Sequence, residues 1–193
     1  SDCSSPNCTD YLFGKTISGE NRLDVAQSFR ISSQSTINKV SLKLKKFGSP
    51  PNVTVRILGD TGGKPDKNNV KTSGTLSANL VTSSYGFIDV SFSSNPTLSA
   101  NTTYWIVLDT SSDTNNYWSI DTDTLQGYNN GSAKFSPNWQ ASSPVWTTIN
   151  GDFGFKVYTG GTITKFTGGN SAVVNGDLHA NTIQNITVNG DAY

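Results

Sequence analysis

The stretch LSANTTYWIVLD, residues 98–109, carries the strongest structural signal in the chain. A polar turn, Ser99–Thr102, precedes six residues in which the side chains of both alternating sets are mostly apolar or aromatic. A strand of this kind is covered on both faces, so it belongs in the middle of a sheet. Six residues are also too few for a helix to be the better interpretation. We therefore predict that Thr103–Leu108 is a central strand of a β-sandwich.

The composition agrees with an all-β protein. Of the 193 residues, 34% are hydrophobic, and Asn, Ser, Thr and Gly are abundant. These polar residues favour turns and strands over helices. The 14 basic and 14 acidic residues cancel, so no net field directs the chain toward nucleic acid or a membrane surface. The sequence has no apolar run of about 18 residues, so we expect no membrane insertion by this segment.

The two cysteines, Cys3 and Cys8, lie in a Ser/Pro/Asn segment that has no core pattern. Two sulfurs are too few ligands for zinc, and the single histidine, His179, is remote in the sequence. We therefore predict a local disulfide, which implies an oxidising compartment. The chain begins at Ser1 and contains no methionine, as expected of a processed secreted protein or an excised ectodomain. These features predict an extracellular or cell-surface location.

Alternating apolar and polar residues predict seven strands and one weaker strand. In Ile37–Lys45, for example, Val40, Leu42 and Leu44 point inward and the lysines point outward. The predicted strands are Val25–Ile31, Ile37–Lys45, Val53–Leu58, Phe87–Phe92, Thr103–Leu108, Asn116–Ile120 and Asp152–Tyr158, with the weaker one at Val145–Thr148. This pattern is typical of a two-sheet antiparallel sandwich of jelly-roll type.

The chain is predicted to have three parts. Residues 1–20 form an irregular arm that the disulfide clips, residues 21–158 form the sandwich, and residues 159–193 form a tail. Within the sandwich, residues 59–75 are predicted to form a polar loop.

Several phrases of the sandwich resemble a family of bacterial cell-surface jelly-roll domains. These are the "choice-of-anchor" type modules of secreted and wall-attached proteins, and they are distantly similar to carbohydrate-binding modules. The phrases are AQSF (26–29), KVSLKLKKFGSPPNVTVRIL (39–58), GFIDVSF (86–92), LSANTTYWIVL (98–108) and GDFGFKVY (151–158). The resemblance covers about residues 22–158 and implies an extracellular, non-catalytic module. It implies no particular ligand, because fold and function separate easily.

The tail contains a short repeat after a Gly160-Gly161 hinge. Val174–Asp177 and Val188–Asp191 both read VNGD and lie fourteen residues apart. Short apolar steps separated by such turns are typical of β-solenoid rungs or of β-ribbon hairpins. Two repeats are too few to be stable alone. We therefore predict β contacts with other copies of the chain, as in a trimer or filament; the alternative is that the tail lies back on its own sandwich.

Calcium is the expected metal, because hard oxygen ligands are plentiful. The resemblance to jelly-roll modules implies a Ca²⁺ ion between the sheet ends, held by an acid near the first strand and another just before the last. These positions correspond to Asp24 and Asp152, with Glu20 or backbone carbonyls assisting. The alternative is that they are ordinary loop acids.

Aromatic residues in predicted loops are candidates for binding glycans. Tyr128, Trp139 and Trp146 lie near side-chain amides such as that of Asn138. Aromatic rings stack on sugar faces, and amides bind the hydroxyl groups. The alternative is that these rings only cap the sandwich core.

Catalysis finds little support in the sequence. The single histidine, His179, lies in the tail, away from any Ser-centred motif for which it could act as the base. The carboxylate pairs that a glycosidase needs would have to come from loop acids, Asp121 with Asp123 or Asp109 with Asp113. The leading prediction is therefore a non-catalytic structural or adhesive module of a microbial surface or appendage protein. The second is a carbohydrate-binding module, and the third is a polysaccharide-degrading enzyme.

Overall fold

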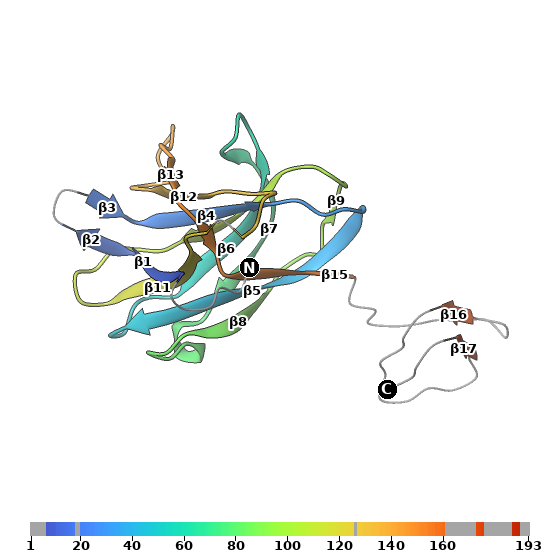
Figure 1. Cartoon of the computed structure of the whole chain (residues 1–193), viewed down its shortest axis with the longest axis horizontal. Coiled ribbons are helices and arrows are strands. Elements are labelled where there is room, and N and C mark those ends of the chain that lie inside the picture. Colours follow the sequence, from blue (N-terminus) through green and yellow to red (C-terminus); the bar gives the residue numbers. More distant parts are fainter. Residues whose placement is uncertain (1–6, 18–19, 126, 161–172, 176–186, 190–193) are drawn as a thin grey trace. The chain divides into compact units, whose positions relative to one another are not determined.

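The computed structural model describes residues 7–17, 20–125, 127–160, 173–175 and 187–189. This part of the chain is all-β: it consists of strands, loops and one short 3-10 turn, η1 (Ala78–Leu80), without an α-helix (Figure 1). The all-β fold that the sequence predicts is therefore confirmed. The chain divides into two compact units, Ser1–Gly161 and Thr162–Tyr193.

One sheet of the first unit is built around its longest strand, β5 (Ser35–Phe47), and we call it the β5 sheet. Its strands pair antiparallel. The path runs β1 (Cys8–Phe13), β11 (Tyr117–Asp123), β5 and β15 (Phe155–Thr159), with β8 (Gly86–Ser91) and β9 (Thr97–Leu98) also on β5 and β14 (Asp152–Phe153) on β11.

The other sheet, the β10 sheet, has β10 (Tyr104–Asp109) in its interior. Its antiparallel order is β13 (Thr147–Ile149), β12 (Ala133–Ser136), β4 (Asp24–Phe29), β10, β6 (Val53–Asp60) and β7 (Pro65–Leu76). Ile106 of β10 is opposite Gln27 on one side and Ile57 on the other. The prediction of a central strand in residues 103–108 is therefore confirmed.

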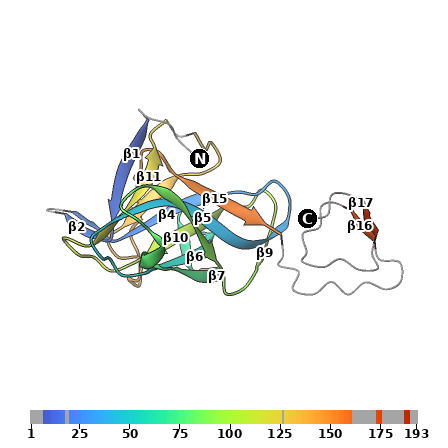
Figure 2. The ribbon, with the colours of Figure 1, turned by 90° about the horizontal axis from the view of Figure 1, so that it is seen from below.

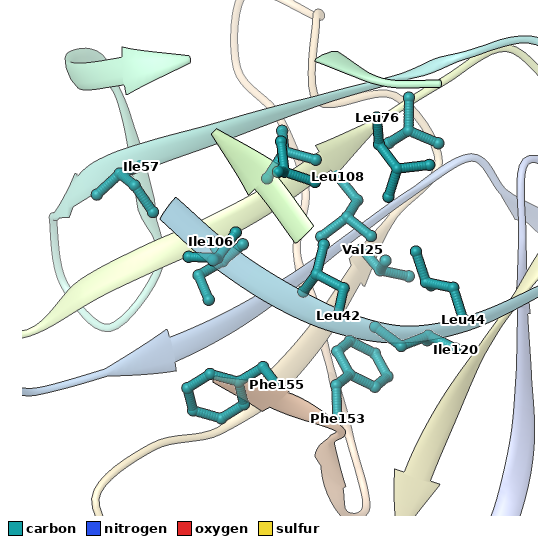
Figure 3. Close-up of a cluster of buried hydrophobic side chains, with 14 of the residues drawn as sticks. Val25, Leu42, Leu44, Ile57, Leu76, Ile106, Leu108, Ile120, Phe153 and Phe155 are labelled. Atoms are coloured by element: carbon teal, nitrogen blue, oxygen red, sulfur yellow. The ribbon is translucent and has the colours of Figure 1, made fainter. Parts of the chain in front are cut away.

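The two sheets form two layers (Figure 2), and the hydrophobic core lies between them (Figure 3). Period-two alternation supplies it from both sides. The β10 sheet contributes Val25, Ile57, Ile106 and Leu108, and the β5 sheet contributes Leu42, Leu44, Ile120, Phe153 and Phe155. Most of these side chains have no more than 1% of their surface exposed. Their burial is the main favourable contribution to the stability of this unit.

The opposite face of β10 is covered by a different set of residues. Trp105 and Val107 lie there with Ala26, Leu58 and Trp139 in a second buried cluster, against which Trp146 packs. Both faces of β10 are thus buried, as the sequence predicts. The cover on this outer face comes from the segment after β12 and not from the β5 sheet.

Several strands lie where the sequence predicts irregular structure, and these predictions are wrong. Residues 8–13 form β1, in register with β11, and Phe13 is fully buried. The predicted loop 59–75 contains most of β7, and β12 was not predicted. β1 and β7 are edge strands whose exposed faces are polar, so they lack the apolar alternation of an interior strand.

Two short pairs complete the described structure. β2 (Lys15–Ile17) and β3 (Glu20–Arg22) form an antiparallel pair. In the second unit, β16 (Val173–Asn175) and β17 (Thr187–Asn189) pair in parallel, with Val174 opposite Val188.

Candidate ligand-binding cleft

A polar cleft of about 370 Å³ lies at one end of the β10 sheet. Because β10 runs antiparallel to β4 and β6, its first residue, Tyr104, is opposite Phe29 near the end of β4 and Gly59 near the end of β6. Side chains distant in sequence therefore meet there. The principal lining residues are Arg30, Asp60, Thr103, Trp105, Asn129 and Asn130.

The carboxylate of Asp60 is held in place by two donors. The indole Nε1–H of Trp105 donates to Oδ1 at 2.7 Å, and the backbone N–H of Gly63 donates to Oδ2 at 3.2 Å. Gly63 has φ +76°, a conformation that glycine adopts without strain. Asp60 itself is exposed, so it presents a fixed, charged acceptor to the cleft.

Arg30 supplies the positive charge of the cleft. Its Nε–H donates to Oγ1 of Thr103 at 2.9 Å, and its backbone N–H donates to the hydroxyl of Tyr128 at 3.0 Å. Within the described residues, no carboxylate forms an ion pair with Arg30. Since Arg30 is exposed, its remaining guanidinium N–H groups are available to a ligand.

A tight turn holds the two asparagines at the rim. Ser132 N–H donates to Oγ of Ser28 at 2.8 Å, and Ser28 N–H donates to the carbonyl of Ser132 at 3.0 Å. A Cβ atom on Gly131 would lie 2.2 Å from the carbonyl oxygen of Ser28, so only glycine fits. The turn places Asn129 and Asn130 in exposed positions beside the cleft.

The chemistry of the cleft suits a neutral ligand rich in hydroxyl groups. Arg30 and Asp60 cancel in charge, and the other polar groups are amides and hydroxyls that donate and accept hydrogen bonds. The ring of Trp105 is only 1% exposed, so it contributes part of the wall and no open face for stacking.

Most of the aromatic residues predicted to bind ligand lie elsewhere. Trp139 is 4% exposed and covers the outer face of the β10 sheet. The guanidinium carbon of Arg56 lies 5.0 Å from its ring centroid. Trp146 packs against the same cluster, and Asn138 binds Gln140 N–H through Oδ1 at 3.0 Å. The alternative that these rings act as a cap therefore describes Trp139 best.

Tyr128 is the predicted ligand residue that lies beside the cleft. Its hydroxyl accepts from the backbone N–H of Arg30 and donates to the carbonyl of Arg30 at 3.3 Å. Its ring meets that of Phe155 edge-on, with centroids 5.3 Å apart. Tyr128 therefore positions the backbone that carries Arg30.

The predicted calcium ligands are not assembled into one site. Asp152 accepts a hydrogen bond from Gln27 Nε2 at 3.0 Å on the core side of β4. Side chains alternate between the two faces of a strand, so Asp24, three residues before Gln27, lies on the outer face of β4. Glu20 forms an ion pair with Arg22. Among the described residues, no three His, Cys, Asp or Glu side chains are grouped so that they could hold a metal ion. Asp24 and Asp152 thus each have separate hydrogen-bond partners on opposite faces of β4, and calcium binding stays a prediction.

A carboxyl pair, the buried Asp24 and the half-buried Asp109, was not predicted from the sequence. Leu108 is opposite Val25, so the next residues, Asp109 and Asp24, are neighbours on the outer face. Burial, aided by the adjacent Asp109 carboxylate, raises the pKa of Asp24 to about 7, although the N–H of Trp139 opposes the shift. Asp24 is fully buried, so a substrate cannot reach it.

The other acids that the sequence pairs as glycosidase candidates each have hydrogen-bond or ion-pair partners of their own. Asp109 Oδ2 binds Nη1 of Arg56 at 2.6 Å, and Asp113 Oδ1 accepts from the backbone N–H groups of residues 115 and 116. Asp121 is buried, with its Oδ2 3.1 Å from Nζ of Lys43. Asp123 accepts from the N–H of Leu125.

Part of the predicted chemistry lies outside the described residues. Cys8 begins β1 and is not a free thiol, but Cys3 is not described, so their pairing stays a prediction. His179 is likewise outside the described residues, as are Gly176–Asp177 and Gly190–Asp191 of the repeat.

Comparisons with known proteins assign no family. No family model matches the chain, and no curated protein matches it. Within the described residues, no helix has the length and apolar character needed to cross a membrane. Function is therefore inferred from the geometry of the cleft.

Proposed function

We propose that this chain is a non-catalytic extracellular module that binds a neutral saccharide through the cleft beside Asp60, as an adhesive part of a microbial surface protein. The observation that carries the proposal is the charge-balanced lining of the cleft: one fixed carboxylate, one guanidinium that forms no ion pair within the described residues, and two exposed amides around about 370 Å³.

Each of these groups matches what a sugar offers. A saccharide hydroxyl both donates and accepts hydrogen bonds. The Asp60 carboxylate can accept from its O–H, and the Arg30 guanidinium can donate to its oxygen. Asn129 and Asn130 can serve both. Trp105 and Gly63 already fix the Asp60 carboxylate, which reduces the ordering cost of binding.

The distribution of acids supports binding without catalysis. Glycoside hydrolysis needs two carboxyl groups that flank the scissile bond. Asp60 is the only carboxylate among the described residues that line the cleft. The pair of Asp24 and Asp109 lies beneath the Trp139 segment, with Asp24 fully buried.

We also propose that the two sheets form a jelly roll. This architecture is supported by the path of the chain, which passes repeatedly from one sheet to the other: β4, β6, β7, β10 and β12 lie in the β10 sheet, and β5, β8, β11 and β15 in the β5 sheet. Alternation between two antiparallel sheets is a property of jelly rolls.

Assembly through the tail is a second candidate function. The parallel pairing of β16 with β17 supports a solenoid rung over a β-ribbon, because a hairpin would pair its strands antiparallel. Val174 and Val188, which face each other, are the first residues of the two VNGD repeats. Further rungs, or other copies of the chain, would extend such a stack.

A glycan array tests the binding proposal. We expect the full chain to bind neutral glycans saturably and Asp60→Asn to lose this binding. The matched control is Asp89→Asn, which makes the same change at an exposed acid on β8. Melting curves of the variants check that each is folded. Failure of the wild type to bind any neutral glycan, or full binding by Asp60→Asn, would refute the proposal.

A further inference from the structure

A second polar cleft adjoins the first. Its volume is about 340 Å³, and Asp60 and Thr103 line both clefts. The second cleft is completed chiefly by Gly59, Asn69 and Lys71. Because the two clefts share two lining residues, they form neighbouring parts of one surface depression.

The chain builds the second cleft from β6 and β7. The β6–β7 register shifts between Leu58 and Asp60, so the residues around Asn69 depart from regular pairing. A Cβ atom on Gly59 would lie 2.3 Å from Nδ2 of Asn69. The missing side chain at position 59 therefore lets the Asn69 amide lie directly against the end of β6.

The second cleft repeats the chemistry of the first. The first contains Arg30 and two asparagine amides, and the second contains Lys71 and the amide of Asn69. Neither cation forms an ion pair within the described residues. Each cleft therefore combines one cation, side-chain amide groups and the same carboxylate, which suits a ligand made of similar neutral units.

We propose that the two clefts are adjacent subsites for consecutive units of one linear, neutral oligosaccharide, with Asp60 contacting both units. This inference rests on the proposed function. Each carboxylate oxygen of Asp60 accepts one hydrogen bond from the protein, Oδ1 from Trp105 and Oδ2 from Gly63. An ionised carboxylate has about four acceptor positions, so each oxygen keeps capacity for a sugar hydroxyl.

The test is the dependence of binding on ligand length. The probes are glucose, galactose, mannose and N-acetylglucosamine, each with a disaccharide and a trisaccharide of the same sugar. Titrations of the full chain are followed by NMR, using the indole N–H of Trp105 for the first subsite and the side-chain amide of Asn69 for the second. We expect a disaccharide to shift both signals and to bind about tenfold more tightly than its monosaccharide.

Variants separate the two subsites. Asn69→Ala should reduce disaccharide affinity to the level of the monosaccharide, and Asp60→Asn should weaken both ligands. Asp89→Asn, remote from the clefts, should match the wild type. If monosaccharides bind but disaccharides gain nothing, or if Asn69→Ala keeps the gain, the inference is overturned and the proposed function stands. If no sugar in any series binds, the proposed function and the inference are both refuted.

Discussion

Gln27 and Asp152, 125 residues apart in sequence, are hydrogen-bonded inside the sandwich. Gln27 Nε2 donates to Asp152 Oδ1 at 3.0 Å, and Gln27 Oε1 accepts from the backbone N–H of Phe153 at 2.8 Å. The other carboxylate oxygen accepts from the N–H of Tyr128 at 3.1 Å. This buried link joins the two sheets and fixes Tyr128, which in turn holds Arg30 beside the cleft.

Replacing Gln27 with Leu should lower the free energy of unfolding by about 3 kcal/mol, because it leaves Oδ1 of the buried Asp152 without its donor and the Phe153 N–H without its acceptor. Urea denaturation measures the loss. Gln34→Leu is the matched control at an exposed position and should change stability by no more than about 0.5 kcal/mol. Similar values for the two variants would contradict a structural role of the Gln27 link.

Trp105→Ala and Trp139→Ala should both destabilise the protein by about 3–5 kcal/mol, because both rings are buried in the same cluster. The sequence predicts that Trp139 is the more exposed and dispensable of the two. The structure corrects this prediction, with exposed fractions of 1% and 4%. Trp146→Ala, at a half-buried ring, should cost less. A small effect of Trp139→Ala in chemical denaturation would count against this packing.

Stability should fall as the pH rises toward neutrality because of Asp24. Its pKa is raised from 3.8 to about 7 in the folded protein, so the folded state holds this proton more tightly than the unfolded state. The resulting stabilisation is complete below about pH 4 and is lost as the pH rises through about 7. Asp24→Asn should flatten this decline, and Asp89→Asn should not. The comparison requires denaturation curves at several pH values; parallel curves for wild type and Asp24→Asn would disprove the linkage.

Cys3 and Cys8 should form a disulfide in protein purified without reductant. Intact mass should be about 2 Da lower than after reduction, and a Cys8→Ser variant should show no such difference. The loop is short, so we expect the bond to add only about 2 kcal/mol to stability. Two alkylatable thiols in the native protein would disprove the pairing.

Deleting residues 162–193 should leave a folded, monomeric sandwich, because the first unit contains its own core. The full chain should associate as its concentration rises, through the parallel strands of its second unit. Light scattering of both chains across concentration measures the difference. A full-length chain that stays monomeric at high concentration would rule out assembly through the tail.

The strands at residues 37–45 and 103–108 were predictable because their evidence is local. The alternation in Val40, Leu42 and Leu44 and the two apolar faces of residues 104–108 depend only on the period of a strand. The edge strand β7 was not predictable in the same way. β7 pairs with one neighbour through its backbone, which requires hydrogen-bonding groups but no apolar side chains.

The sequence by itself therefore determined the all-β class, the central position of β10 and the abundance of polar groups suited to hydroxyl-rich ligands. Only the tertiary structure decided which of them meet. Arg30, Asp60 and Asn129 belong to three segments that antiparallel register brings to one cleft. The same register makes Asp24 and Asp109 neighbours and separates Asp24 from Asp152. Register depends on contacts between distant segments, and a shift of one residue would move each side chain to the opposite face of the sheet.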